Sequence, residues 1–197
     1  GSFKGKKTLE PKDIKTRPLK DLTKESIFNI INHSNKFKIN LENSNVLDLF
    51  SGIGGFSVGL EATGKFKTIG FCEQDKFCHK VLHKHWPNIP IHEDIKKLDG
   101  TKIKADVIVG GFPCQGFSMA GNRVVTDERN TLYLDMLEIV KKINPSFVVM
   151  ENVEGLRSML DGKVEEKIVG DFKSAGYDLR VTTLNSADYY TPQKRKR

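Results

Sequence analysis

The sequence predicts a doubly wound α/β fold with a mostly parallel sheet, and two observations lead to this prediction. Short apolar runs typical of buried parallel strands alternate along the chain with segments whose apolar residues recur at helical spacing. Alternating strands and helices build parallel sheets through right-handed crossovers, and ligands then bind beyond the carboxyl ends of the strands. The chain has 197 residues, which is enough for one such domain.

The expected elements follow one another from residue 46 onward. Apolar runs predict strands at 46–50, 68–71, 90–95, 105–109 and 147–150, and the run at 90–95 carries the weakest pattern. Apolar residues at helical spacing predict helices at 76–85, 131–143 and 164–175. The sequence therefore predicts five strands and, between or after them, three helices.

The positive charge of the chain is concentrated at its two ends. The net charge is +7, to which residues 1–24 contribute +5 and the last four residues +4. We expect residues 1–24 to be a basic flexible arm beginning with a Gly1-Ser2 cloning scar, 25–44 to be a short helical lead-in, and 45–197 to be the folded domain. The basic ends fit either contact with nucleic acid or a solvated tail.

Composition excludes several classes of protein. No apolar run approaches twenty residues, so we expect a soluble domain with no membrane span and no membrane partner. The three cysteines cannot all pair with one another, and no secretory signal precedes them. We therefore expect a reducing, cytoplasmic setting.

A glycine-rich turn, Phe50-Ser51-Gly52-Ile53-Gly54-Gly55-Phe56, lies between the first strand and an expected helix. Its spacing departs from G-x-G-x-x-G, so the turn taken alone fits either a ligand loop or a simple tight turn. Glu73 and Asp94 stand at the ends of the second and third strands, where carboxylates suit ribose hydroxyls and an adenine amino group. Each could also be an ordinary surface carboxylate, but together the three strand ends favour a nucleoside-shaped ligand.

Cys114 follows the fourth strand within Gly111-Phe112-Pro113-Cys114-Gln115. A cysteine at this edge of the sheet suits a nucleophile facing the ligand crevice, whereas the alternative of a small buried side chain fits Cys72 better. Glu151 ends the next strand, so a nucleophile and a proton donor or acceptor should lie over one site. Attack on an electron-poor ring needs both a nucleophile and an acid. The acid forms a hydrogen bond with the ring nitrogen and so stabilises the charge that develops there.

With these residues in place, the sequence resembles the cytosine carbon-5 DNA methyltransferase family. The matching segments, in the family's order, are 48–55, Glu73, Asp94, 111–115, 130–132, 151–153 and 193–197. The Pro-Cys-Gln and Glu-Asn-Val pair is highly specific, and the other segments support it. The resemblance implies a Rossmann-like S-adenosylmethionine-dependent methyltransferase fold and makes 45–197 a catalytic domain that is incomplete at its carboxyl end.

The resemblance also implies a mechanism. Cytosine is flipped out of double-stranded DNA, and the Cys114 thiolate adds to ring carbon 6. Glu151 forms hydrogen bonds with ring nitrogen 3 and the exocyclic amine, and this makes carbon 5 nucleophilic. Carbon 5 then takes the methyl group of S-adenosylmethionine, leaving S-adenosylhomocysteine. Arg195, the third implied catalytic residue, helps to hold the flipped base or orders the loop that carries Cys114.

The family's binding residues transfer to this sequence by register. The implied cofactor-binding residues are Asp48, Phe50, Ser51, Gly52, Ile53, Gly54, Gly55, Glu73, Gln74, Asp94, Ile95, Gly111, Pro113 and Leu132. The implied substrate-binding residues are Gln115, Ser118, Arg123, Arg129, Asn152, Gln193 and Arg197. One segment departs from the pattern, because Val124-Val125-Thr126 stands where glycine or a charged residue is expected.

Family members continue past the Gln-x-Arg-x-Arg segment into a target-recognition region, whereas this sequence stops at Arg197. We therefore expect a second chain or a missing carboxyl-terminal segment to complete the enzyme, and poor methylation by the chain alone. The commonest setting for the family is bacterial or phage restriction-modification.

The sequence also fits three alternatives. The first is a transfer RNA (cytosine-5)-methyltransferase of the same family. The second is a catalytically silent regulatory subunit, which the presence of Cys114, Glu151 and Arg195 disfavours. The third is a zinc site among His79, His83, His85, His92 and Cys78, which we do not expect because no second cysteine pair at zinc spacing is present.

Overall fold

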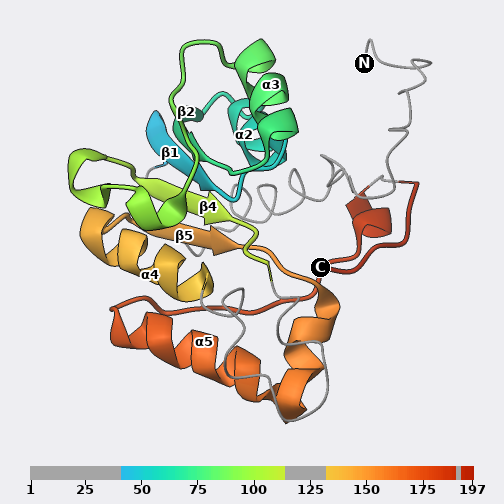
Figure 1. The fold of residues 1–197 in the computed structure, drawn as a ribbon. Coiled ribbons are helices and arrows are strands. Elements are labelled where there is room, and N and C mark those ends of the chain that lie inside the picture. Colours follow the sequence, from blue (N-terminus) through green and yellow to red (C-terminus); the bar gives the residue numbers. More distant parts are fainter. Residues whose placement is uncertain (1–40, 114–131, 190–191) are drawn as a thin grey trace.

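The computed structural model describes residues 41–113, 132–189 and 192–197, and a five-stranded parallel sheet forms the centre of this part (Figure 1). The strands are β1 Ser44–Leu49, β2 Phe66–Cys72, β3 Ile91–His92, β4 Val107–Gly110 and β5 Phe147–Met150. Their order across the sheet is β3-β2-β1-β4-β5, and every pairing is parallel. The predicted doubly wound α/β fold is confirmed.

Four α-helices lie in the described residues. They are α2 Gly55–Glu61, α3 Lys76–His85, α4 Leu132–Ile143 and α5 Lys163–Ser174. Shorter 3₁₀ segments are η1 Ile95–Lys97, η2 Gly100–Lys102, η5 Glu154–Gly162 and η6 Ser186–Tyr189. Helix α3 begins at Lys76 because the Asp75 side chain accepts hydrogen bonds from two N–H groups of the first turn. The three predicted helices differ from α3, α4 and α5 by no more than one residue at either end.

Two apolar clusters cover the two faces of the sheet. Leu60 of α2 packs with Val46 on one face, and Met136 of α4 packs with Leu47 on the other. Val46 and Leu47 are neighbours in β1, and they belong to different clusters because successive side chains of a strand point to opposite faces. Both faces are therefore buried, as the continuous apolar runs of the sequence predict.

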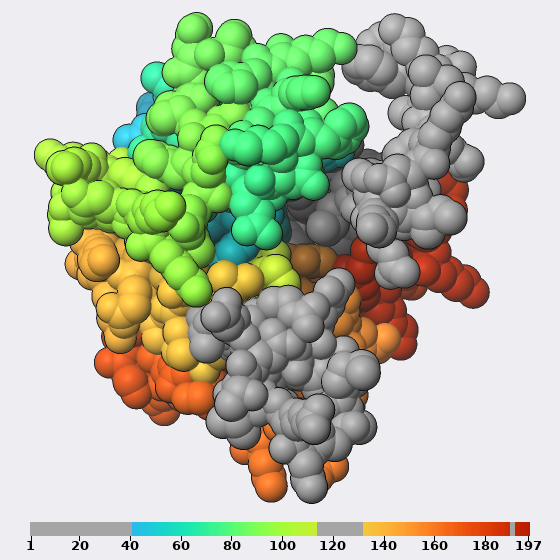
Figure 2. Space-filling model, viewed as in Figure 1, coloured from blue at the N-terminus to red at the C-terminus, as the bar shows by residue number. Residues whose placement is uncertain are grey.

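The order of the strands creates a switch point in the sheet. The chain moves from β1 outward through β2 to β3, then returns to β4 on the other side of β1. Crevices at such a point, outside the carboxyl ends of the strands, are where open α/β sheets bind ligands. Figure 2 shows α3 in green above and α4 and α5 in yellow and orange below. Between them is a small blue area, the colour of the residues around β1.

The third strand is shorter than predicted. The sequence predicts a strand at 90–95, but β3 contains only Ile91 and His92. Asp94 starts the 3₁₀ segment η1 instead, because its side chain accepts a hydrogen bond from the N–H of Lys96 at 3.0 Å. Asp94 therefore lies just beyond the strand and does not end it.

The structure describes almost none of the two segments predicted before the folded domain. The expected arm 1–24 lies outside them, as does all of the lead-in 25–44 except its last four residues, and β1 already begins at Ser44. None of the helices in the described ranges has the length and apolar character needed to cross a bilayer.

Candidate functional site

The turn after β1 has a backbone that suits glycine at two positions. Gly52 and Gly54 have φ angles of +53° and +83°, in the left-handed region. The N–H of Gly54 donates to the Ser51 carbonyl at 2.8 Å and closes the turn, and the N–H of Ser51 donates to the Cys72 carbonyl at 3.2 Å. A side chain at Gly52 would meet no atom within 4 Å, so the turn leaves open space at this glycine.

Asp48, at the end of β1, is fully buried. Its Oδ2 accepts a hydrogen bond from the Ser57 hydroxyl of α2 at 2.8 Å. Asp48 was expected to bind the cofactor, and the described geometry gives it a contact that joins the strand before the glycine turn to the helix after it. Ser57 was not singled out from the sequence, where one serine in a helix carries no signal.

Glu73, at the end of β2, is held by three backbone N–H groups. Oε2 accepts from Gly52 at 2.7 Å, and Oε1 accepts from Gln74 and Asp75 at 2.9 Å each. Nε2 of His79 lies 2.5 Å from the Glu73 carbonyl oxygen. The glycine turn and Glu73, which the sequence analysis placed at separate strand ends around one ligand, are therefore joined by a direct hydrogen bond.

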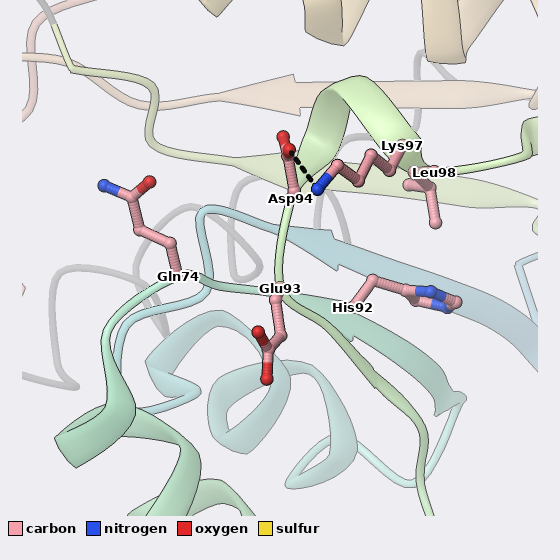
Figure 3. Close-up of a pocket in the computed structure, with 6 residues that line it drawn as sticks. All are labelled: Gln74, His92, Glu93, Asp94, Lys97 and Leu98. Carbon is pink, nitrogen blue, oxygen red and sulfur yellow. Dashed lines mark ion pairs between the residues drawn. The ribbon is translucent and has the colours of Figure 1, made fainter.

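A pocket of about 420 Å³ opens beside the ends of β2 and β3 (Figure 3). Its lining residues are Gln74, His92, Glu93, Asp94, Lys97 and Leu98. Asp94 forms an ion pair with Lys97 at 3.8 Å, and burial lowers the pKa of His92, which favours its neutral form. Gln74 and Asp94 were expected here; the other four were not, because no motif marks them.

The ends of β4 and β5 meet closely. The N–H of Glu151 donates to the Gly110 carbonyl at 3.0 Å, and a side chain at Gly111 would come within 3.1 Å of Glu151 Oε2. Glu151 is 9% exposed, and its Oε1 lies 2.8 Å from Nε of Arg197. The close approach at Gly111 leaves a buried carboxylate directly beside the segment that leads to Cys114.

Asn152 links the same two strand ends through its side chain. Its Nδ2 donates to the Phe112 carbonyl at 3.0 Å, and its Oδ1 accepts from the N–H of Val153 at 2.9 Å. Both polar groups of the amide are thus engaged within the protein, although Asn152 was expected to bind substrate.

Residues 193–197 are paired with an earlier segment. Leu184 and Arg197 exchange two backbone hydrogen bonds of 2.7 and 2.9 Å, and Asn185 bridges Lys196 in antiparallel orientation. The Ser186 hydroxyl donates to the Gln193 carbonyl at 2.5 Å. Arg195 is half-buried, and its N–H donates to Oδ1 of Asn185 at 3.1 Å. The charged segment is therefore part of the fold at the β5 end.

Several expected site residues have less informative placements. Cys114, Gln115, Ser118, Arg123 and Arg129 lie outside the described residues. Ile95 is buried in η1, Gly55 is buried at the start of α2 and Leu132 begins α4. Phe50, Ile53 and Gly111 are half-buried, and Pro113 is exposed.

The described cysteines are poor nucleophiles. Burial, with smaller contributions from Glu73 and Asp94, raises the pKa of Cys72 to about 12. Burial, assisted by Glu73 and Asp75, raises the pKa of Cys78 to about 11. Within the described ranges no three of the side chains that bind metals come together as a metal site, so the histidines near Cys78 form no such cluster.

Comparison with known proteins places these features in one family. A family model of C-5 cytosine-specific DNA methylases matches residues 44–197. Type II methyltransferase M.DdeI of Desulfomicrobium norvegicum is 41% identical over 162 residues, covering 78% of this chain and 39% of the relative. Type II methyltransferase M.BspRI of Lysinibacillus sphaericus is 33% identical, covering 100% and 54%. The chain thus spans about half or less of the length of these relatives.

Solved structures give the same result for the fold. A prophage-encoded E. coli chain described as a DNA modification methyltransferase matches with a TM-score of 0.66 and 30% identity, covering 78% of this chain and 44% of that one. The S. pombe Dnmt2 methyltransferase matches with a TM-score of 0.64 and 22% identity, covering 78% and 49%, and this likeness concerns the fold alone.

Proposed function

We propose that this chain, which belongs to the C-5 cytosine-specific DNA methylase family, forms the cofactor-binding and catalytic part of a DNA (cytosine-5)-methyltransferase. The observation that carries the proposal is the buried Glu151 carboxylate at the end of β5, beside Gly111 and paired with Arg197. The family's activity needs an acidic group next to the cysteine loop, and Glu151 lies where the segment leading to Cys114 begins.

S-adenosylmethionine is the cofactor that the family implies, and the residues present fit its nucleoside. The pocket beside Asp94 and Gln74 is of nucleoside size and is lined mainly by polar side chains. Gly52 leaves open space at the glycine turn, and the carboxylate of Glu73 is fixed next to it. In this proposal Glu73 accepts from the ribose and Asp94 from the adenine amino group, and the bound cofactor supplies a methyl group.

The proposed chemistry uses the chain's own groups on a flipped cytosine. The Cys114 thiolate forms a bond to ring carbon 6, while Glu151 in its protonated form donates a hydrogen bond to ring nitrogen 3 and accepts one from the exocyclic amine, and so stabilises the negative charge displaced into the ring. Carbon 5 becomes nucleophilic and takes the methyl group, and S-adenosylhomocysteine would be the product left from the methyl donor. Loss of the carbon 5 proton then expels the Cys114 thiolate and restores the aromatic ring. Arg195 helps to hold the flipped base, and Arg197 holds Glu151 in place through their ion pair.

We further propose that a carboxyl-terminal part, on the same or a second chain, supplies target recognition. The support is the coverage of the relatives, since this chain accounts for 39% of one and 54% of another. Double-stranded DNA is the proposed substrate, and a cytoplasmic restriction-modification system of a bacterium or phage is the proposed setting, because these relatives are type II methyltransferases.

The test measures transfer of labelled methyl from S-adenosylmethionine to unmethylated plasmid DNA and, in parallel, to transfer RNA, with Cys114→Ser as control. Because turnover by the chain alone should be poor, a single-turnover readout is added, using long duplex DNA that contains 5-fluorocytosine. Fluorine cannot leave carbon 5 as a cation, so the adduct with Cys114 should persist under denaturing conditions. A denaturant-stable adduct that forms with the wild type and is absent from Cys114→Ser is the expected result.

Each outcome separates one reading from another. If Cys114→Ser still transfers labelled methyl to DNA, or still forms the adduct with 5-fluorocytosine DNA, Cys114 is not the nucleophile. Label in transfer RNA alone shows the RNA-directed alternative. Robust turnover on DNA by the 197-residue chain alone overturns the proposal that a further part is needed.

A further inference from the structure

Trp86, the C-cap residue of α3, lies against the glycine turn. A Cβ built on Gly54 would come within 2.6 Å of Cζ3 and 2.9 Å of Cη2 of the Trp86 ring, and within 2.9 Å of Cδ2 of Leu82. Gly54 therefore packs its bare Cα against the indole, and no larger residue fits there without movement. Helices α2 and α3 lie side by side at this contact (Figure 1).

The indole is itself held by a hydrogen bond and by the packing of its ring. Its Nε1 donates to Oε2 of Glu61, at the end of α2, at 2.9 Å. Oε1 of the same Glu61 accepts from the N–H of Thr68 in β2 at 3.0 Å. The ring packs against Phe71 of β2 at a centroid distance of 5.1 Å. A half-buried ring with this many contacts has one orientation, so it presents a fixed surface to the turn.

The turn has two supports on different elements. Glu73 at the end of β2 accepts from the N–H of Gly52, and Trp86 packs against Gly54 two residues later. Glycine adopts left-handed and right-handed backbone about equally well, so contacts from neighbouring elements are needed to hold both glycines in the left-handed one. Fixing the turn before the ligand arrives lowers the entropy lost on binding, and this gain appears directly as affinity.

We propose that Trp86 is a positioning residue for the cofactor, which sets the conformation of the turn at 51–54 and through it the affinity for the nucleoside ligand. This inference rests on the proposed function, since it takes the turn to be part of the S-adenosylmethionine site. Trp86 touches the turn and not the pocket lined by Gln74 and Asp94, so its effect on the ligand is indirect.

The test uses the full 197-residue chain with S-adenosylhomocysteine as ligand. Trp86 is the only tryptophan of the chain, so its emission reports on this contact alone. Calorimetry gives the dissociation constant, and the fluorescence titration should show a change in emission with the same midpoint. Trp86→Ala should weaken binding about tenfold, whereas Trp86→Phe, which keeps an aromatic ring on Gly54, should remain within about threefold of the wild type.

A control separates positioning from general loss of stability. Phe172→Ala removes a fully buried ring of α5 in the cluster on the α4 side of the sheet, so it should lower the melting temperature without weakening binding below that temperature. Equal losses of affinity in Trp86→Ala and Phe172→Ala, or calorimetric binding with unchanged Trp86 emission, would overturn the inference. Absence of calorimetric binding to the wild type would instead reject the proposed cofactor, and the inference with it.

Discussion

Nε of Arg197 lies 2.8 Å from Oε1 of Glu151, and both side chains are largely buried. The contact joins the last residue of the sequence to the end of β5. Backbone hydrogen bonds to Leu184 fix the main chain of Arg197, and Nη1 of its guanidinium donates to the Lys196 carbonyl at 2.9 Å. A charge removed from water needs a partner, and here each of these groups supplies the other's opposite charge. The ion pair therefore connects the carboxyl-terminal segment to the proposed catalytic carboxylate.

Replacing Arg197 should cost more stability than replacing its neighbour. Arg197→Ala removes the charged partner of a carboxylate that is 9% exposed, and should lower the free energy of unfolding by about 2 kcal/mol. Lys196→Ala breaks an exposed ion pair with Glu154 and should change it by less than about 0.5 kcal/mol. Urea unfolding of both variants measures the difference, and equal effects would contradict the assigned importance of the buried pair.

The two left-handed glycines of the turn should respond differently to alanine. Gly52→Ala introduces only left-handed strain, about 1 kcal/mol, because the space around it is open. Gly54→Ala adds a clash with Trp86 and Leu82 and should cost about 3 kcal/mol in unfolding free energy. Adding Trp86→Ala should relieve part of the Gly54→Ala cost. Additive losses in the double variant would argue against direct contact between these two residues.

Native thiol reactivity should distinguish Cys114 from the other cysteines. At pH 8 a thiol with a pKa of about 12, such as Cys72, is ionised in about one molecule in ten thousand, and Cys78 with a pKa of about 11 in about one in a thousand. A thiol reagent should therefore label one cysteine rapidly in the native protein and three in denaturant. Cys114→Ser should abolish the rapid phase. A rapid phase that remains in this variant would show that Cys72 or Cys78 is reactive after all.

The sequence predicts best those features that depend on the ends of parallel strands. Glu73 and Glu151 could be assigned because each follows an apolar run, and the carboxyl ends of parallel strands share one edge of the sheet. The glycine turn could be assigned because its residues stand between a strand and a helix. Periodicity also located α3, α4 and α5 to within one residue, since their apolar faces are regular.

Contacts between distant segments could not be predicted in this way. Nothing in the local pattern of 193–197 distinguishes a charged tail from a segment that pairs with Asn185. Trp86 stands at the end of a polar helix, where a single aromatic residue has no periodic meaning, and its contact with Gly54 depends on how α3 packs against the turn. Asp94 was expected to end a strand because the apolar pattern does not show that its side chain caps η1.

The hydrogen bond from Asn152 to Phe112 gives a prediction with a defined pH dependence. Asn152→Ala removes the donor to the Phe112 carbonyl and should cost about 1 kcal/mol of unfolding free energy. Asn152→Asp places a carboxylate against that carbonyl, so at pH 7 it should cost about 1 kcal/mol more than alanine. Since the native contact favours the protonated acid, the pKa of the introduced carboxyl should be raised in the folded state.

When the pKa of a carboxyl is raised in the folded state, its contribution to stability is fully present only when the pH is below the pKa of the unfolded state, which is about 4 for aspartate. This contribution is lost as the pH rises through the folded-state pKa. The stability difference between Asn152→Asp and the wild type should therefore be small at pH 3.5 and grow toward pH 7. Urea unfolding at several pH values measures it, with Asn88→Asp, at an exposed residue before β3, as the control. A difference independent of pH, or one as large in the control, would show that the Asn152 amide does not donate to the Phe112 carbonyl in solution.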